Sequence, residues 1–475
     1  MGVSTNLVPG CGRQEEDSQL TGSGVTQQKL NVLAIIVDDL RPQLKCYGRE
    51  QMISPHLDRL AAEGMLFERA YCQVPICGAS RASTLSGVRP TWERFGSNYK
   101  ARKDKDFPEG ISLPGIFKQH GYRTISYGKV YHTLDDDRDS WIEGPWRPWG
   151  MWGQNAYVKP ENQAIAATRE GAYGPPVEMA DVADNVYADG KIAERTVETL
   201  DRLKDKPKPF FLAVGFFKPH LPFNAPKKYW DLYDRDDINL ADNPFRPAGA
   251  PNAALHNWGE LRAYDGIPKE GPVSEDMART LIHGYYACTS YIDAQIGTVL
   301  DALDQFGLRD HTIVVLWGDH GWQLGEHGLW CKHANFETSL HSPLLVRAPG
   351  FPEGQRTAAL VEFVDIYPSL CELCGIELPE YLEGSSFVPL LDDPERPWKE
   401  AAFSRYQRGE SIKVDRYRYT EWRNDPEEIR ATMLYDHVAD LGENTNIADR
   451  PENAELVRKL SEQLKQGWRA FRPPT

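Results

Sequence analysis

The sequence predicts an α/β fold in two parts. The larger part is a mixed, mostly parallel sheet sandwiched by helices, and the smaller, C-terminal part is an α/β domain on an antiparallel sheet. The first prediction rests on short, continuous apolar runs that alternate with helix-like stretches, the pattern of a parallel sheet buried on both faces. The second rests on a change after residue 396, where short β-type runs follow one another closely.

Length and composition are consistent with this fold. At about 150 residues per domain, 475 residues suggest two or three domains, or one large core with an appendage. Apolar residues make up 41% and charged residues 26%, which excludes a disordered chain, a collagen and a coiled coil. The net charge of −15 argues against binding nucleic acid or anionic lipid through the overall field, so an anionic ligand would need a local positive pocket.

Three regions are predicted. Residues 1–29 are polar and read as a disordered leader without a signal-peptide pattern, 30–395 form the large domain, and 396–475 form the smaller C-terminal subdomain. No apolar run approaches the ~20 residues of a membrane span. Eight cysteines are too few for a disulfide scaffold, and Cys371 and Cys374 lie in a helix-like stretch where packing is a simpler reading than zinc binding.

Four apolar runs predict the central strands, and each is followed by polar residues. The runs are Asn31–Val37, Arg123–Tyr127, Phe210–Phe217 and Thr312–Trp317. The residues that follow them are Asp38 and Asp39, Lys129 and His132, His220, and Asp319 and His320. Helix-like stretches lie between, at Ser54–Glu63, Val186–Leu203 and Thr280–Phe306. Because ligands bind beyond the carboxyl ends of parallel strands, these side chains predict a site at one sheet edge.

Each piece alone has an ordinary structural interpretation. Two aspartates after a strand usually form a turn or a helix cap, and a lone histidine such as His220 is usually a hydrogen-bonded structural residue. Only the convergence of four strands makes a functional site the better prediction.

A candidate nucleophile lies between the first two runs. Ser80–Leu85 is typical of the start of a helix, so Cys77 falls at the helix N-terminus, where the dipole favours negative charge. Arg81, one turn further on, adds a cation that can bind an oxyanion. The alternative is a small buried cysteine beside a surface arginine.

This segment resembles the signature of the type I, formylglycine-dependent sulfatases, which is C-x-(P or A)-x-R. Here it reads Cys77-Gly-Ala79-Ser-Arg81, with alanine where proline is commoner. Further matches are Gly128–His132, Lys218–Phe223, Gly318–Gly328 and Leu434–Asn446. The Lys-x-x-His spacing, KPHLPF, GDHGWQLGEHG and the histidine at position 320 look most like the iduronate-2-sulfatase branch. Together these motifs are specific, whereas any one would be weak. The resemblance implies an alkaline-phosphatase-like fold with a catalytic domain over residues 30–395.

The resemblance also implies a role for each candidate residue. A separate maturation enzyme oxidises Cys77 to formylglycine, whose hydrate is the nucleophile. The implied ligands of a Ca²⁺ ion, with Mg²⁺ as the alternative, are Asp38, Asp39, residue 77, Asp319 and His320. The cations expected to contact the sulfate are Arg81, Lys129 and Lys332. His220 is the implied acid and His132 the implied base.

The function implied is hydrolysis of an O-sulfate ester of a sugar, in an iduronate-2-sulfatase-like glycan fragment. Two alternatives stay open. One is a phosphonate or phosphate monoester hydrolase of the same superfamily, and the other is a glycan-binding homologue made inactive by an unmodified Cys77. The expected partners are the sulfated carbohydrate and the maturation enzyme, with no nucleic acid and no membrane span. The resemblance alone favours a periplasmic or secreted location.

Two sequence features bear on the substrate. A basic stretch could guide a polyanionic glycan or could be a solvated loop; it comprises Arg89, Arg94, Lys100, Arg102, Lys103 and Lys105. A tryptophan-rich segment could stack on sugars, although packing against the core is the simpler interpretation; it contains Trp141, Trp146, Trp149 and Trp152.

Overall fold

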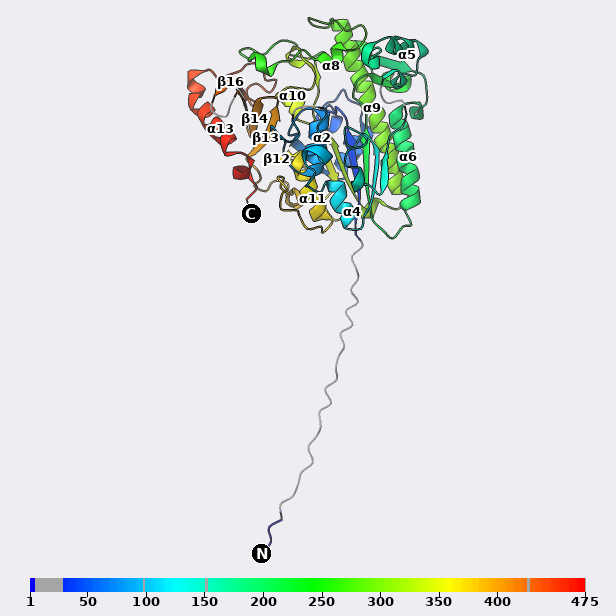
Figure 1. The fold of residues 1–475 in the computed structure, drawn as a ribbon, viewed down its shortest axis with the longest axis vertical. Helices are drawn as coiled ribbons and strands as arrows, with labels where there is room; N and C mark the ends of the chain where they lie inside the picture. The colour runs from blue at the N-terminus through cyan, green and yellow to red at the C-terminus, as the bar shows by residue number, and fades with distance from the viewer. Residues whose placement is uncertain (5–28, 97–98, 150–152, 425–427, 475) are drawn as a thin grey trace.

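A computed structural model describes residues 1–4, 29–96, 99–149, 153–424 and 428–474 (Figure 1). Of the leader predicted over residues 1–29, residues 5–28 lie outside these ranges. Within them, the central sheet has eight strands in the order β12-β2-β11-β8-β1-β6-β3-β4. Their bounds are β1 Asn31–Val37, β2 Met65–Tyr71, β3 Arg123–Gly128, β4 Glu143–Trp146, β6 Phe210–Phe216, β8 Thr312–Gly318, β11 Leu344–Arg347 and β12 Gln355–Glu362.

The sheet is mixed and mostly parallel, which confirms the predicted fold class. β1 pairs in parallel with β6 and β8, and β3 pairs in parallel with β6 and β4. Only β11 runs antiparallel to its neighbours, β2 and β8, while β12 is parallel to β2.

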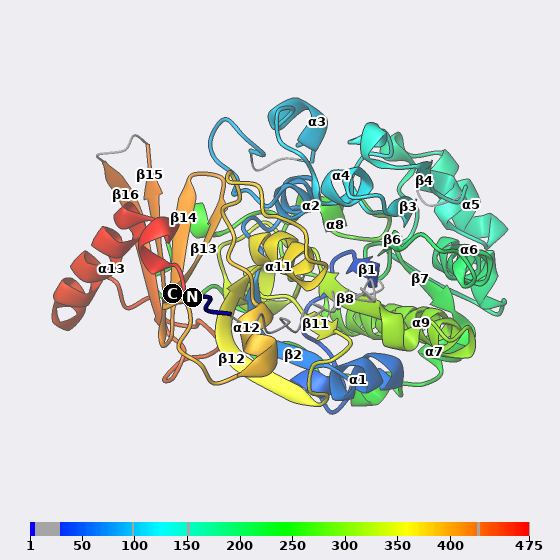
Figure 2. The same cartoon turned by 90° about the horizontal axis from the view of Figure 1, so that it is seen from below.

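Helices cover both faces of the sheet (Figure 2). Alternate residues of β1 explain its continuous apolar run: Leu33 belongs to a core shared with α6 (Ala188–Leu203) and α9 (Glu275–Gln305), whereas Val32 belongs to a core shared with α4 (Leu113–Gln119) and α11 (Ile366–Leu373). The other helices and short strands are α1 Pro55–Ala62, α2 Cys77–Ser86, α3 Lys103–Asp106, α5 Pro160–Ala167, α7 Lys227–Trp230, α8 Gly259–Arg262, α10 Glu337–Leu340, α12 Val388–Asp392, β5 Val177–Ala180, β7 Phe223–Pro226, β9 Gln323–Leu324 and β10 Trp330–Cys331.

The C-terminal region forms a separate antiparallel sheet. Its strands are β13 (Ala401–Tyr406), β14 (Gly409–Val414), β15 (Tyr417–Arg423) and β16 (Ile429–Asp436), in that order. Helix α13 (Ala454–Gln466) packs on β14 and β15. The helix expected over Asn453–Phe471 is shorter because Gly467 adopts a φ of 73° and ends it. A domain boundary at residues 395 and 396 stays a prediction.

The basic stretch is largely neutralised by carboxylates. Arg89 forms ion pairs with Glu362, Arg94 with Glu383, and Arg102 with Asp104 and Asp135. These carboxylates compensate the three arginines of the stretch.

The tryptophan-rich segment does not act as one unit. Trp141 is buried, Trp146 packs against Tyr127 with ring centres 5.8 Å apart, and Trp149 is exposed. Trp152 lies outside the described residues.

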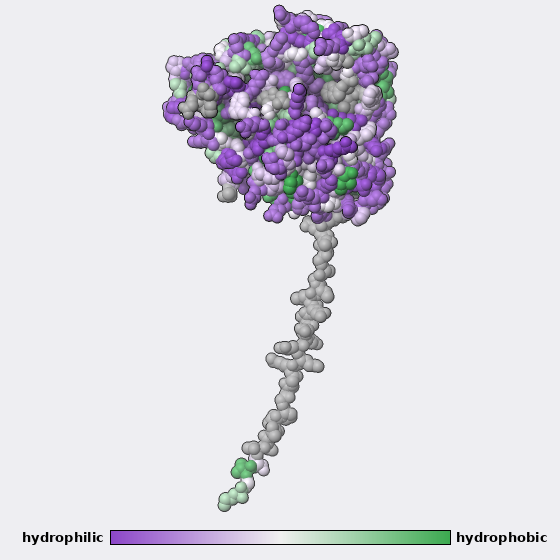
Figure 3. All heavy atoms as spheres, viewed as in Figure 1, coloured by the Kyte–Doolittle hydropathy of each residue, from purple (hydrophilic) through white to green (hydrophobic). Residues whose placement is uncertain are grey.

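The surface in Figure 3 is mainly hydrophilic, with isolated apolar residues. In the part of the chain that the structure describes, no helix combines the length and the apolar character needed to cross a bilayer. Cys371 is buried inside α11 and Cys374 follows its last residue, so the C-x-x-C pair lies in a packed helix, as expected.

Candidate functional site

The candidate site lies at the carboxyl edge of the central sheet, where the strand pairing continues past the strand ends. The amide of Asp38 donates to the carbonyl of Phe216 at 3.1 Å, and the amide of Asp319 donates to the carbonyl of Val37 at 3.1 Å. The amide of Lys129 donates to the carbonyl of Gly215 at 2.8 Å. Three predicted residues from distant parts of the chain are thereby fixed side by side.

Two facing glycines allow this close approach. Gly128 has a φ of 70°, and a Cβ there would lie 2.0 Å from the carbonyl oxygen of Gly215. A Cβ at Gly215 would in turn lie 2.1 Å from the main chain of Lys129. Only glycine fits at either position without displacing the backbone that carries Lys129.

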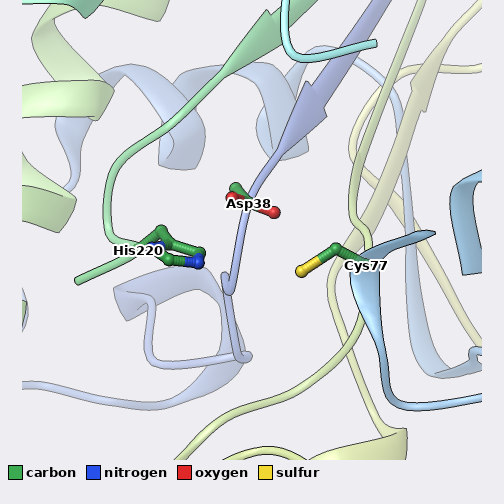
Figure 4. A group of neighbouring side chains, drawn as sticks. All are labelled: Asp38, Cys77 and His220. Atoms are coloured by element: carbon green, nitrogen blue, oxygen red, sulfur yellow. The ribbon is translucent and has the colours of Figure 1, made fainter. Parts of the chain in front are cut away.

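Cys77 is the first residue of α2 and is fully buried. Its Sγ lies 3.2 Å from Nε2 of His320 and 3.9 Å from Oδ1 of Asp39. Figure 4 shows the sulfur of Cys77 and the carboxylate of Asp38 directed into the space between β1 and α2, with His220 on the opposite side of Asp38. Burial and the charge of Asp38 raise the pKa of the Cys77 thiol well above its usual value. An unmodified thiol here is therefore protonated at neutral pH and is a poor nucleophile.

The predicted metal ligands form a compact set of donors. The carboxylate oxygens of Asp38, Asp39 and Asp319 lie within 4.8 Å of one another, and donors of Asp39, Cys77 and His320 form a second group within that limit. All are buried. Three buried carboxylates are oxygen ligands of the kind that Ca²⁺ and Mg²⁺ prefer.

The electrostatics of Asp39 fit a cation in this set. Burial raises its pKa to about 7; the charge of Lys332 opposes this shift, and the neighbouring Asp38 adds to it. The neighbouring lysine thus does not fully offset the negative charge of Asp39 and Asp38. A bound divalent cation would offset it.

Of the three cations expected to contact a sulfate, Lys129 and Lys332 lie at the site, each bonded to an aspartate. The Lys129 ammonium bonds to Asp38, and the Lys332 ammonium lies 3.1 Å from Oδ1 of Asp39. The Arg81 guanidinium also lies at the site and is buried, with Nε 2.9 Å from Asp319 and Nη2 3.1 Å from Asp38. The expected contact of these three cations with a sulfate stays a prediction.

The two predicted proton-transfer histidines both lie near the cluster. Burial and the charge of Lys129 lower the pKa of His132 to about 2, so its ring is neutral at neutral pH. Burial and the charge of Lys332 also lower the pKa of His220, while the carboxylates of Asp38 and Glu260 oppose this shift. Nε2 of His220 lies 3.1 Å from Oε1 of Glu260 and 3.8 Å from Oδ2 of Asp39.

Glu260 and Tyr99 were not expected from the sequence. Oε2 of Glu260 lies 2.9 Å from the Lys332 ammonium and accepts a hydrogen bond of 3.1 Å from the Tyr99 hydroxyl. Burial alone would raise the pKa of Glu260, but Lys332 and His220 hold it well below the usual range. Glu260 lies on the four-residue helix α8, outside any strand pattern, so nothing local in the sequence marks it.

This fold and this edge cluster define an α/β protein with a buried acidic site at the carboxyl edge of a mostly parallel sheet. The Sulfatase family model matches residues 30–376, and the model for the C-terminal region of N-sulphoglucosamine sulphohydrolase matches residues 325–469. The chain therefore belongs to the sulfatase family, a family of enzymes that hydrolyse sulfate esters.

Known proteins with similar sequences or folds agree with this assignment. Iduronate 2-sulfatase from Homo sapiens is 33% identical over 506 aligned positions, which cover 89% of this chain and 90% of the relative. A phosphonate monoester hydrolase from Silicibacter pomeroyi has a TM-score of 0.76 at 21% identity, covering 94% of this chain and 96% of its own. A structure in complex with its substrate D-glucosamine-2-N,6-O-disulfate has a TM-score of 0.75 at 21% identity, covering 93% and 98%. These two structures support the fold alone.

The expected family, fold class and enzyme class are thus confirmed. The individual roles of the site residues stay predictions. The likeness to a phosphonate hydrolase at the level of fold does not separate sulfate from phosphonate esters.

Proposed function

We propose that the protein removes an O-sulfate group from a sugar, with the iduronate 2-sulfatase type of substrate as the first candidate. The observation that carries this proposal is the 33% identity to iduronate 2-sulfatase over about nine-tenths of both chains. The buried edge cluster is consistent with it, because it places acids, cations and histidines around Cys77.

The proposed modification explains why Cys77 is so poorly suited to act as a thiolate. Oxidised to formylglycine by a separate maturation enzyme, residue 77 would offer a hydroxyl of its hydrate as the nucleophile. A divalent cation, Ca²⁺ first and Mg²⁺ second, would be held by Asp38, Asp39, Asp319 and His320, and would supply Lewis acidity and offset the carboxylate charge. Export to the periplasm or secretion is part of the same proposal, since it would expose the enzyme to extracellular glycans.

The other residues follow from their positions. Lys129 and Lys332 bind the charged sulfate oxygens, since both ammonium groups face the cluster. His220 protonates the leaving sugar oxygen, and the neutral His132 takes a proton from residue 77. Arg81 holds Asp38 and Asp319 in place.

The test is an assay of released sulfate on defined sulfated mono- and disaccharides, run beside aryl sulfate, aryl phosphate and aryl phosphonate esters. Turnover of a sugar sulfate with a preference for sulfate over phosphonate supports the proposal. A phosphonate preference of a hundredfold or more overturns it in favour of the second candidate, a phosphonate monoester hydrolase. The observation that favours this candidate is the TM-score of 0.76 to the phosphonate monoester hydrolase from Silicibacter pomeroyi.

An inactive glycan-binding protein is distinguished by mass. Conversion of Cys77 to formylglycine lowers the mass of the peptide containing residue 77 by about 18 Da. A fully unmodified peptide in an inactive sample that still binds sulfated sugars would favour the binding protein.

A further inference from the structure

A cavity lies in the C-terminal region. Its volume is about 500 Å³, within the range of small-molecule pockets. It opens between the sheet β13–β16, helix α13 and the loop that follows α2. Its wall includes Trp92, Arg408, Glu410, Glu421, Arg423 and Lys465, and we call it the C-terminal cavity.

An exposed indole with a buried guanidinium behind it forms one wall. Trp92 is 58% exposed, although large aromatic side chains are normally buried. The guanidinium of Arg405 stacks on its ring at 4.1 Å from the centroid. Arg405 is only 8% exposed, and its buried Nε has no hydrogen-bond partner. Burial lowers the pKa of Arg405, and the charge of Glu410, its cross-strand partner on β14, opposes this shift.

The opposite wall supplies free positive charge. Among the described residues, no carboxylate lies within 4 Å of Arg408 or Lys465, and Arg408 bonds only to Asn424. The carboxylate of Glu421 is occupied by Arg423 at 2.5 Å. In a chain of net charge −15, this local excess of cations favours an anionic ligand.

Glu410 gives the cavity an acceptor for hydroxyl groups. It faces Glu421 across the register of β14 and β15, an unfavourable pairing of like charges. No cation of the described residues lies within 4 Å of Glu410. An aromatic face, two cations with no carboxylate within 4 Å among the described residues, and the Glu410 carboxylate together match a sugar ring that carries both hydroxyl and acidic groups.

The cavity is connected to the reaction centre by two short segments. Tyr406, at the end of β13, packs on His333 with ring centres 5.8 Å apart, and His333 follows Lys332. The hydroxyl of Tyr99, seven positions after Trp92 in the chain, bonds to Glu260. In Figure 1, β13 and β14 accordingly lie between α13 and α2. The end of β13 thus packs against the segment that carries Lys332.

We propose that the C-terminal cavity is an outer subsite for an acidic sugar of a longer sulfated glycan. The sugar ring stacks on Trp92, its acidic group binds Arg408 and Lys465, and its hydroxyls donate to Glu410. This inference rests on the proposed function and adds that the substrate is an oligosaccharide or polysaccharide rather than a single sugar.

The test compares chain lengths. We would measure kcat and KM of full-length Trp92→Ala and Lys465→Ala on a heparin-derived disaccharide and on an octasaccharide. Each variant should raise KM for the octasaccharide roughly three- to tenfold, with kcat unchanged and the disaccharide unaffected. Lys459→Ala is the matched control, because it removes the same charge from the same helix outside the cavity wall.

The outcomes are distinguishable. Equal effects on both chain lengths, no effect of either variant, or an equal effect of Lys459→Ala would overturn the outer subsite while the wild-type enzyme still cleaves the disaccharide. If the wild-type protein releases no sulfate from either probe, the proposed function fails for these glycans. In that case direct titration of the octasaccharide onto wild type and Trp92→Ala decides the subsite by itself, and identical affinities would overturn it.

Discussion

Replacing Glu260 with glutamine should separate substrate binding from turnover. Its carboxylate accepts hydrogen bonds from three segments at once, through Lys332 at 2.9 Å, His220 at 3.1 Å and Tyr99 at 3.1 Å. Glutamine keeps the shape but replaces one acceptor oxygen with a donor. Hydrogen bonds to charged groups contribute about 1.5–3 kcal/mol each, so the loss of one should lower the free energy of unfolding by roughly that amount.

The kinetic effect follows from position and charge. Without Glu260, the ring of His220 loses the acceptor that fixes it, and kcat on a sugar sulfate should fall roughly 100-fold. Lys332 retains its bond to Asp39 at 3.1 Å but loses a neighbouring negative charge. Anions should therefore bind at least as tightly as before, so KM and the inhibition constant for free sulfate should stay constant or decrease.

The assay is released sulfate at saturating and limiting substrate, together with inhibition by sulfate and thermal unfolding. Glu326→Gln is the matched control: its side chain is 15% exposed against 14% for Glu260, and it pairs with one cation, Arg41, at 2.7 Å. That variant should lose stability without the split between kcat and KM. An unchanged kcat in Glu260→Gln, or weaker sulfate binding together with the lower kcat, would refute a positioning role for Glu260.

Three further predictions follow from the structure. Cys77→Ala should abolish sulfate release while leaving the thermal unfolding midpoint within a few degrees of wild type, because the thiol forms no ion pair. Residual turnover above about 1% of wild type, measured on the same sugar sulfate, would argue against residue 77 as the nucleophile. Dialysis against a chelator should lower both activity and the unfolding midpoint, and Ca²⁺ should restore both better than Mg²⁺; a midpoint that does not respond to either ion would argue against a resident metal. Burial alone would raise the pKa of Glu362, but Arg89 and Lys399 hold it at about 2, below its unfolded value near 4.3. The ionised carboxylate therefore contributes roughly 3 kcal/mol to the free energy of unfolding above pH 5, and this contribution is lost as the pH falls towards 2. Glu362→Gln should unfold more easily at pH 7, and its stability should depend less on pH in this range, as measured by urea titration at several pH values.

The four central strands could be predicted because each is buried on both faces and therefore reads as an unbroken apolar run. The polar residues after them followed from the geometry of parallel sheets. β11 could not be placed from the sequence, because it lies between β8 and β2, and its paired residues on β2 are about 280 positions away in the chain.

At the site, too, the sequence does not indicate contacts between residues that are distant in the chain. Arg81 was expected to contact the sulfate because its spacing from Cys77 is one helical turn, but spacing does not tell which neighbours surround a guanidinium. In the structure its guanidinium pairs with Asp38 and Asp319, which the spacing did not indicate. Glu260 enters the site from a helix of four residues preceded by Trp258 at a φ of 36°, a local geometry with no sequence signature.

The backbone beside Lys332 has a consequence for how its ammonium is directed. Cys331 and His333 have φ values of 72° and 66°, in the left-handed region that non-glycine residues adopt at a cost of about 1–3 kcal/mol each. The main chain therefore turns sharply on both sides of one lysine and points it inward. A valine in place of either neighbour would keep Lys332 itself but strain the turn that directs its ammonium, so the position of the amine depends on the backbone of the two residues beside it.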